Sequence, residues 1–152
     1  MAGKLAGIGR HARPKAPMET LDHVAVSAAE GVHGDYRGAM AAQKRSFRRQ
    51  VSLIEVAAWE AALADCGADL AWHHSRRNLL LDGISLPHAI GTRVMIGASL
   101  VIEIMDECDP CERMEALAAG LRAAMTPDWR GGFLGRVVVD GEIAVGDEVR
   151  VI

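Results

Sequence analysis

The residues of this sequence best suited to chemistry are two cysteines in the segment ECDPC, residues 107–111. Cys111 directly follows Pro110, which stiffens the backbone, and precedes a predicted helix over residues 112–119. The unpaired N–H groups and the dipole at the start of a helix favour a thiolate. A thiol at such a turn is held in place and stays reachable. Cys111 is therefore the candidate nucleophile, sulfur carrier or ligand for a soft metal.

Three other interpretations of the Cys-x-x-Cys pair remain open. The only further thiol is Cys66, and no second cysteine pair or spaced histidine pair completes a zinc tetrahedron, so structural zinc is disfavoured. A thioredoxin-like redox motif needs a strand-to-helix placement inside a βαβ unit, whereas the flanks here are typical of β-hairpins. The third alternative is that the cysteines are small buried hydrophobic residues.

A second candidate group is Arg76 and Asn78, in a predicted strand over residues 75–81. The alternation of side chains along a strand places these two residues on one face and Arg77 on the other. A guanidinium and an amide side by side can bind a planar anion, because one offers a fixed fork of donors and the other both a donor and an acceptor. The alternative is a solvated strand face with one structural ion pair.

Glycines mark two further segments where the backbone could approach a ligand. Gly34 and Asp35 lie in the first, GVHGDYRG at residues 31–38, whose spacing matches neither a Walker loop nor a dinucleotide fingerprint. That segment by itself predicts a turn. In the second, Arg130 stands beside a Gly-Gly pair, while Lys15 lies in a predicted irregular loop over residues 10–18.

The elements that position these residues are mostly short strands. A capping box formed by Ser52 and Glu55 predicts a helix that ends at Gly67 and buries Trp59 and Cys66. Residues 39–49 are predicted to be a polar segment without regular structure. Strands are predicted over residues 4–9, 22–26, 50–54, 75–81, 92–105 (two strands), 134–139, 142–145 and 148–152, the pair at 134–145 forming a hairpin. This pattern indicates an all-β or α+β domain built on a barrel-like sheet.

Length and composition limit the classes of function that the sequence allows. The 152 residues predict a single domain over residues 1–152, and a net charge of only -3 gives no electrostatic case for nucleic acid or a membrane surface. The basic residues cluster locally, at 44–49 and 76–77, which suits a small anionic ligand. The odd number of cysteines, the lack of a secretory signal and the absence of an apolar run of about 20 residues predict a cytoplasmic protein.

Taken together, the segments resemble the MOSC family, the domain named for the C-terminal part of molybdenum cofactor sulfurases. The matching segments, in the family's order, are 31–35, 49–54, 76–79, 91–97, 108–111, 130–132 and 141–147. The resemblance implies an α+β, β-rich fold, a MOSC-type β-barrel with a few short helices. It also implies binding of the molybdenum cofactor (molybdopterin), with Cys111 of the Cys-x-Pro-Cys turn as the thiolate ligand of molybdenum.

The same resemblance implies roles for the other candidates. Arg76 and Asn78 match the family's Arg-x-Asn cofactor-binding motif, and Gly34, Asp35, Arg130 and Lys15 are candidates for lining the same pocket. Molybdenum cofactor sulfurases carry a pyridoxal-phosphate desulfurase domain ahead of this one, and 152 residues leave no room for it. Pyridoxal phosphate is therefore not expected in this chain. The mitochondrial amidoxime-reducing components, which are also similar, receive electrons from partner proteins.

These implications favour one function and leave two others open. The first is a molybdenum-dependent oxidoreductase that reduces N-hydroxylated small molecules, with electrons from a separate electron-transfer protein. The second is a sulfur carrier, in which Cys111 holds a persulfide supplied by a cysteine desulfurase and Cys108 resolves it. The third is a module that stores the cofactor without turnover.

Overall fold

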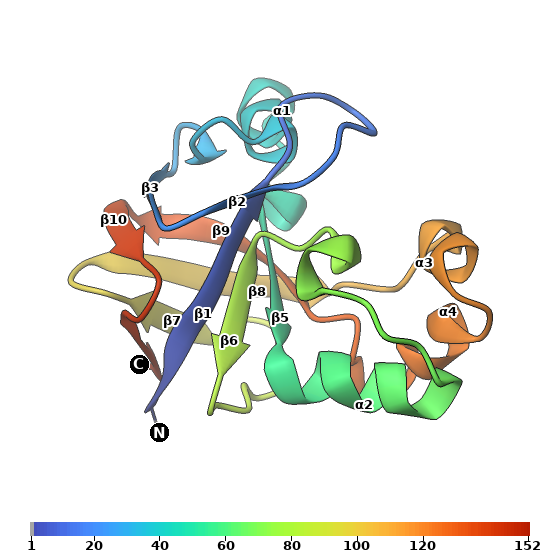
Figure 1. Ribbon diagram of the computed structural model, residues 1–152. Helices are drawn as coiled ribbons and strands as arrows, with labels where there is room; N and C mark the ends of the chain where they lie inside the picture. The colour runs from blue at the N-terminus through green and yellow to red at the C-terminus, as the bar shows by residue number, and fades with distance from the viewer. Residues whose placement is uncertain (1) are drawn as a thin grey trace.

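The computed structural model describes residues 2–152, which form a β-barrel with helices at its ends and side (Figure 1). The strands are β1 (Ala2–Arg10), β2 (Glu19–Leu21), β3 (His23–Ser27), β4 (Gly31–Val32), β5 (Val51–Glu55), β6 (Leu79–Asp82), β7 (Arg93–Ile96), β8 (Leu100–Glu107), β9 (Phe133–Val139), β10 (Gly141–Ala144) and β11 (Glu148–Val151). The helices are α1 (Tyr36–Lys44), α2 (Val56–Cys66), α3 (Glu112–Leu117) and α4 (Leu121–Ala124), with 3-10 turns η1 (Phe47–Arg49), η2 (Trp72–Ser75) and η3 (Pro127–Trp129). No helix within residues 2–152 is long and apolar enough to cross a membrane.

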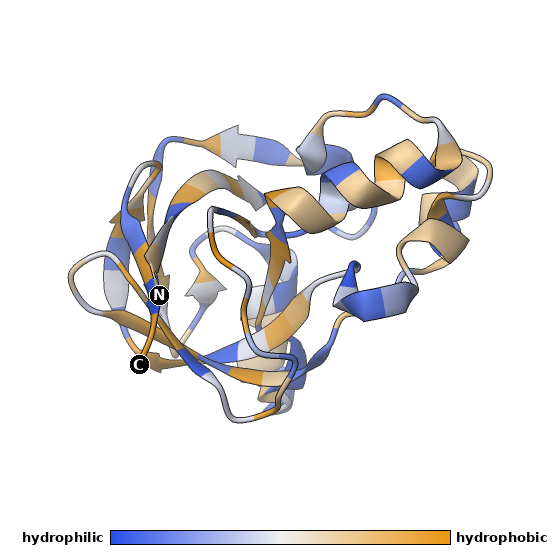
Figure 2. Cartoon of the chain, turned by 90° about the horizontal axis from the view of Figure 1, so that it is seen from below, coloured by the Kyte–Doolittle hydropathy of each residue, from blue (hydrophilic) through white to orange (hydrophobic). Residues whose placement is uncertain are grey.

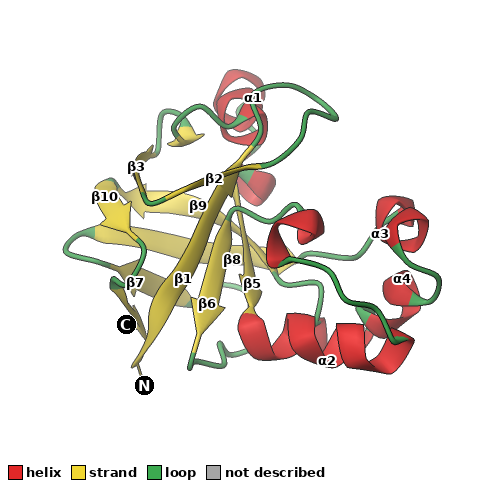
Figure 3. Ribbon diagram, viewed as in Figure 1, coloured by secondary structure: helices red, strands yellow, loops and turns green. Residues whose placement is uncertain are grey.

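The barrel follows the strand order β11-β7-β8-β9-β5-β6-β1, and the pairing of β1 with β11 closes the ring. These strand pairs are antiparallel except β5 and β6, which run parallel and are connected through α2 (Figure 3). In the closed ring each of these strands is hydrogen-bonded to a neighbour on both sides. Within residues 2–152 the barrel therefore has no open sheet edge at which another chain could pair and aggregate. The predicted β-rich barrel with a few short helices is confirmed.

Two hydrophobic cores flank the sheet, and the alternation of side chains explains both. Leu53, Leu79 and Leu81 point into the barrel, while their neighbours Ile54 and Leu80 point outward. The outward side chains form a second core with residues of α2, α3 and α4. Figure 2 shows hydrophobic residues, in orange, recurring along the strands of the barrel and on the helices beside it. Strands β5 and β6 are thus buried on both faces.

Helix α2 begins later than the sequence pattern predicts. Gly67 ends the helix with φ 70°, and Trp59 is buried, both as expected. The predicted capping box is wrong, because Ser52 lies within β5 and bonds with Asn78. Glu55 precedes the helix without capping it, and its carboxylate instead accepts a 2.6 Å hydrogen bond from the Leu86 N–H. Burial raises the pKa of Glu55.

Two other predictions from the sequence are wrong. Strands β9 and β10 are consecutive but do not form a hairpin, since β9 is already bonded on both sides by β5 and β8. Strand β10 pairs instead with β3, in a small separate sheet completed by β4. Residues 39–49, predicted to be irregular, contain most of α1 and all of η1. The N-terminal cap of α1 is Asp35, whose carboxylate accepts a hydrogen bond from the Gly38 N–H.

Gln50 joins the barrel to the segment after β3. Its side chain is fully buried, donates to the Ala28 carbonyl at 2.8 Å and accepts from the Val137 N–H at 2.8 Å. We expect Gln50→Ala to lower the free energy of unfolding by about 2 kcal/mol, because it leaves two backbone groups without partners.

Urea denaturation would measure this change. The matched control is Gln43→Ala on the exposed face of α1, which we expect to change stability by no more than about 0.5 kcal/mol. Equal effects of the two substitutions would contradict this account of Gln50.

Candidate functional site

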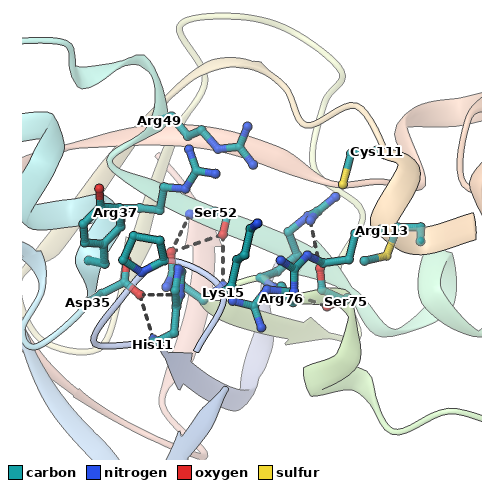
Figure 4. A pocket seen from close by; sticks show the side chains of 15 residues that line it. His11, Lys15, Asp35, Arg37, Arg49, Ser52, Ser75, Arg76, Cys111 and Arg113 are labelled. Carbon is teal, nitrogen blue, oxygen red and sulfur yellow. Dashed lines mark hydrogen bonds and ion pairs between the residues drawn. The ribbon is translucent and has the colours of Figure 1, made fainter. Parts of the chain in front are cut away.

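A cavity of about 280 Å³ lies at one end of the barrel. Because β1 runs antiparallel to β6 and β6 parallel to β5, the end of β1 and the beginnings of β5 and β6 meet there. Segments 11–15 and 35–37, η2 with the residues after it, and the start of α3 complete its walls (Figure 4). Its polar and charged lining residues are His11, Lys15, Asp35, Tyr36, Arg37, Arg49, Ser52, Ser75, Arg76, Arg77, Asn78, Cys111 and Arg113.

Asn78 ties three barrel strands together at this cavity. Its amide oxygen accepts from the N–H of Ser52 at 3.0 Å and from the Ser52 hydroxyl at 3.1 Å. Its amide nitrogen donates to the Gly9 carbonyl at 3.0 Å. Asn78 therefore lies in the cavity wall, as the sequence predicts, but its side chain is largely engaged by the protein. Its role here is to hold β1, β5 and β6 in position.

The strand predicted over residues 75–81 begins only at Leu79, so the predicted separation of Arg76 from Arg77 is wrong. Ser75 ends η2, and Arg76 adopts a left-handed conformation with φ 63°, which interrupts the alternation. As a result Arg76, Arg77 and Asn78 all line the cavity. Burial is the largest influence that lowers the pKa of Arg76, followed by the neighbouring charges of Arg113 and Arg37.

Arg77 carries an unpartnered donor. The side chain is only 5% exposed, and its Nε and Nη1 donate to the carbonyls of Gly131 and Ser75, both at 2.8 Å. The remaining nitrogen, Nη2, is buried and has no hydrogen-bond partner in residues 2–152. A buried donor without a partner is costly, so this atom is a point of strain in the wall of the cavity.

The cavity concentrates positive charge although the chain as a whole is weakly acidic. Its permanently cationic lining residues are Lys15, Arg37, Arg49, Arg76, Arg77 and Arg113. Among the described lining residues Asp35 is the only acid, and its two oxygens accept from the backbone N–H groups of His11 and Gly38. The field inside the cavity therefore favours an anion.

His11 is a buried residue of the cavity wall that lies beside Asp35. Its Nδ1 lies 3.3 Å from Asp35 Oδ1, but the ring is not oriented for a hydrogen bond. Burial lowers the pKa of His11, and Asp35 opposes this shift without cancelling it. The surroundings of His11 therefore favour its neutral form more than water does.

Cys111 and Cys108 occupy different environments. Cys111 is the residue before α3, is exposed, and makes no side-chain hydrogen bond within the described chain. Figure 4 shows it across the cavity from His11 and Asp35. Cys108 is 1% exposed, and Cys66 is partly buried against the second core. Within residues 2–152, no group of three His, Cys, Asp or Glu side chains is arranged to hold a metal ion.

Two candidate residues lie outside the cavity lining. The guanidinium of Arg130 forms an ion pair with Asp65 of α2 at 2.5 Å and donates to the Ala124 carbonyl. Gly34 has φ 83° and lies against the guanidinium of Arg10, next to Asp35 but not in the wall. The structure therefore brings together Cys111, Arg76, Asn78, Asp35 and Lys15, and leaves Arg130 and Gly34 apart.

Several cavity residues were not predicted from the sequence as site residues: His11, Arg37, Arg49, Ser52, Ser75, Arg77 and Arg113. The local basic clusters at 44–49 and 76–77 were a signal for Arg49 and Arg77. His11, Arg37 and Arg113 stand alone in the sequence, and only the fold brings them to the cavity.

Comparison with known proteins identifies the family. The model of the MOSC domain matches residues 34–150, which is most of the chain. The chain belongs to the MOSC family. MOSC domains are associated with binding of the molybdenum cofactor. None of the curated proteins matches the chain.

Solved structures share the fold across almost the whole chain. YuaD from Bacillus subtilis has a TM-score of 0.80 at 18% identity, covering 99% of this chain and 96% of its own. YiiM from Geobacillus stearothermophilus has a TM-score of 0.67 at 14% identity, with coverages of 99% and 73%. YiiM from Escherichia coli has a TM-score of 0.69 at 13% identity, with coverages of 100% and 70%. At these identities the likeness concerns the fold.

The crowding of cations predicts that a small anion stabilises this MOSC protein. We expect inorganic phosphate, at about ten times its Kd, to raise Tm by about 4 °C, because it relieves repulsion among Lys15, Arg76 and Arg113. Arg113→Ala should lose at least half of this gain, whereas Arg122→Ala on the exposed side of α4 should keep it.

Differential scanning calorimetry at constant ionic strength, with chloride as the reference anion, would measure the shift. An equal gain with chloride, or with the Arg113 variant, would contradict an anion site in this cavity.

Proposed function

We propose that this MOSC protein binds the molybdenum cofactor in the cavity, with Cys111 as a thiolate ligand of the metal, and reduces N-hydroxylated compounds. The observation that carries the proposal is the exposed, unpartnered thiol of Cys111 on the same cavity as a cluster of cations. A thiol that packs no core and bonds no neighbour is free to bind a metal.

The residues present fit the chemical groups of this cofactor. A phosphate group matches the charge of Lys15, Arg76 and Arg113. Arg77 adds a further positive charge to the wall beside them. Molybdenum held by sulfur ligands accepts a further soft thiolate, which Cys111 would supply.

The proposed reaction converts an N-hydroxylated compound to the amine and water, and consumes two electrons and two protons. The bound cofactor would supply the centre that accepts the oxygen atom and passes on the electrons. The electrons would come from a separate electron-transfer protein, since the sequence carries no flavin or iron–sulfur motif to supply them. The chain's own residues would bind the cofactor and limit access to the thiolate.

Sulfur transport is a second candidate, favoured by the same exposure of Cys111. In that reaction the Cys111 thiolate would take the outer sulfur of a desulfurase persulfide, leaving the desulfurase thiolate and a persulfide on Cys111. Burial of Cys108 argues against its acting as the resolving thiol without a local rearrangement.

Metal and pterin analysis of protein purified from a molybdenum-replete host would test the leading proposal. We expect molybdenum and pterin in the wild type, and loss of at least about tenfold in molybdenum per chain in Cys111→Ser. Cys66→Ser, which alters a thiol outside the cavity, should retain the metal. The loaded wild type should reduce N-hydroxylaminopurine when given an artificial reductant.

Absence of the cofactor from wild type and Cys111→Ser alike would overturn the proposal. Mass spectrometry after incubation with a cysteine desulfurase separates the second candidate, since only a carrier gains the mass of one sulfur atom at Cys111.

A further inference from the structure

Residues 36–49 form a basic surface beside the cavity, which we call the basic face. It comprises α1, η1 and the turn between them, and it contains five of the 17 basic residues of the chain and none of the 20 acidic ones. Residues 43–49 are all exposed. Figure 1 shows α1 at the end of the barrel where β1 finishes, which is the end that holds the cavity. The basic face is thus a solvent-facing neighbour of the candidate site.

A hollow of about 310 Å³ lies within the basic face. Lys44 and Arg48 contribute to its lining. Tyr36, Arg37 and Arg49 line both this hollow and the cavity, so the two spaces share a wall. A molecule seated on the basic face would therefore lie next to whatever the cavity holds.

Most cations of the basic face lack an acidic partner. The exception is Arg48, which donates to Asp106 at 2.7 Å and so fastens η1 to β8, the strand that leads to Cys111. The side chains that form no ion pair with an acid of residues 2–152 are Arg37, Lys44, Arg45 and Arg49. These guanidinium and ammonium groups are available to carboxylates from another molecule.

Two residues of the basic face do not improve the fold of the chain. Arg45 ends α1 in a left-handed conformation, with φ 50° and ψ 37°, a position that favours glycine and is costly for a residue with a side chain. Phe47 is exposed for 37% of its surface. An aromatic side chain among arginines is typical of the centre of a protein–protein interface. Both residues therefore point to a protein partner.

The charge of the rest of the chain limits the kind of partner. All 20 acidic residues lie outside the basic face, where they outnumber the basic residues. A nucleic acid or a bilayer that extended beyond the basic face would meet this excess of negative charge. A small acidic protein would contact the basic face alone, and complexes of electron-transfer proteins have interfaces of this small class.

We infer that the basic face docks a small acidic electron-transfer protein, whose carboxylates bind Lys44, Arg45 and Arg49 and whose apolar surface covers Phe47. The inference rests on the proposed function, because the delivered electrons need a redox centre in the adjoining cavity. Each reduction there consumes two electrons and two protons. Two one-electron carriers would dock and be oxidised in turn, and the protons would come from water. Docking here leaves Cys111 uncovered, since electron transfer needs proximity to the redox centre, whereas sulfur transfer needs contact with the thiol.

Isothermal titration of the full chain would test the docking, with plant-type ferredoxin and flavodoxin, two acidic electron carriers, as probes. At about 20 mM ionic strength we expect at least one of them to bind with a Kd in the micromolar range. Raising the ionic strength to about 200 mM should weaken this binding at least about tenfold.

Substitutions would locate the contact. Lys44→Ala/Arg45→Gly should weaken binding of the carrier about fivefold and keep the Tm of the chain, because glycine fits the left-handed position. Phe47→Ser should weaken it about threefold without a change in charge. The matched control Arg122→Ala/Arg150→Thr removes two exposed cations from α4 and from the opposite end of the barrel. It should change the Kd by less than about twofold.

Three results would overturn the inference. The first is that neither carrier binds with a Kd below about 100 µM at low ionic strength. The second is that the control pair of substitutions weakens binding as much as the pair in the basic face. The third is that duplex DNA or phosphatidylglycerol vesicles bind this surface more tightly than either carrier does.

This inference and the proposed function can fail separately, because the titration does not depend on the cofactor. Carrier binding through the basic face by a chain that holds neither molybdenum nor pterin would overturn the proposed function and keep the docking surface. A loaded chain that reduces N-hydroxylaminopurine with an artificial reductant, yet binds neither carrier, would do the reverse.

Discussion

Repulsion among cations is the physical constraint on which this site depends. The cavity holds the side chains of Lys15, Arg37, Arg49, Arg76 and Arg113 without an acidic partner for any of them in residues 2–152. Solvent screens the exposed members, whereas Arg76 is partly buried and its pKa is lowered. A structure that gathers like charges must hold them on a rigid frame, or they would separate.

The frame is the closed barrel, and Asn78 fixes its end. By bonding to Ser52 and Gly9, this one side chain fastens β6 to both neighbouring strands beside the cavity. Asp35 has a comparable role nearby, where it caps α1 and accepts a hydrogen bond from the His11 N–H. The polar residues of the site therefore divide into those that hold the wall together and those that face a ligand. Asn78 and Asp35 belong to the first group, and Cys111 and Arg76 to the second.

The sequence predicted the parts of this arrangement that depend on local pattern. Alternation and turn residues indicated the barrel strands, and helical spacing with a terminal glycine indicated α2. The Cys-x-Pro-Cys turn drew attention to Cys111, which does lie on the cavity. Local pattern failed where distant contacts decide the structure. The 3-10 turn before Arg76 interrupts the strand, so the side chains of Arg76 and Arg77 do not alternate between two faces. Strand β9 is already paired with β5 and β8, so it cannot form the predicted hairpin with β10.

Arg130 illustrates the same limit for site residues. Its position beside two glycines suggests a ligand contact, but those glycines serve packing: a side chain on Gly131 would collide with the Cys108 carbonyl. Asp65, far away in sequence, takes the guanidinium. His11 and Arg113 show the converse, because nothing in their flanking residues marks them and only the meeting of β1 with α3 at the cavity brings them into it.

The pairing of β1 with β11 has a consequence for biosynthesis. Ala2 pairs with Arg150, so strands from opposite ends of the sequence seal the ring. During translation the apolar side chains of Leu5 and Ile8, buried in the folded barrel, cannot be fully enclosed until residues 148–151 of β11 have been synthesised. Contacts between residues so far apart in the sequence slow folding, and the sheet would stay open at β1 until β11 is available to pair with it.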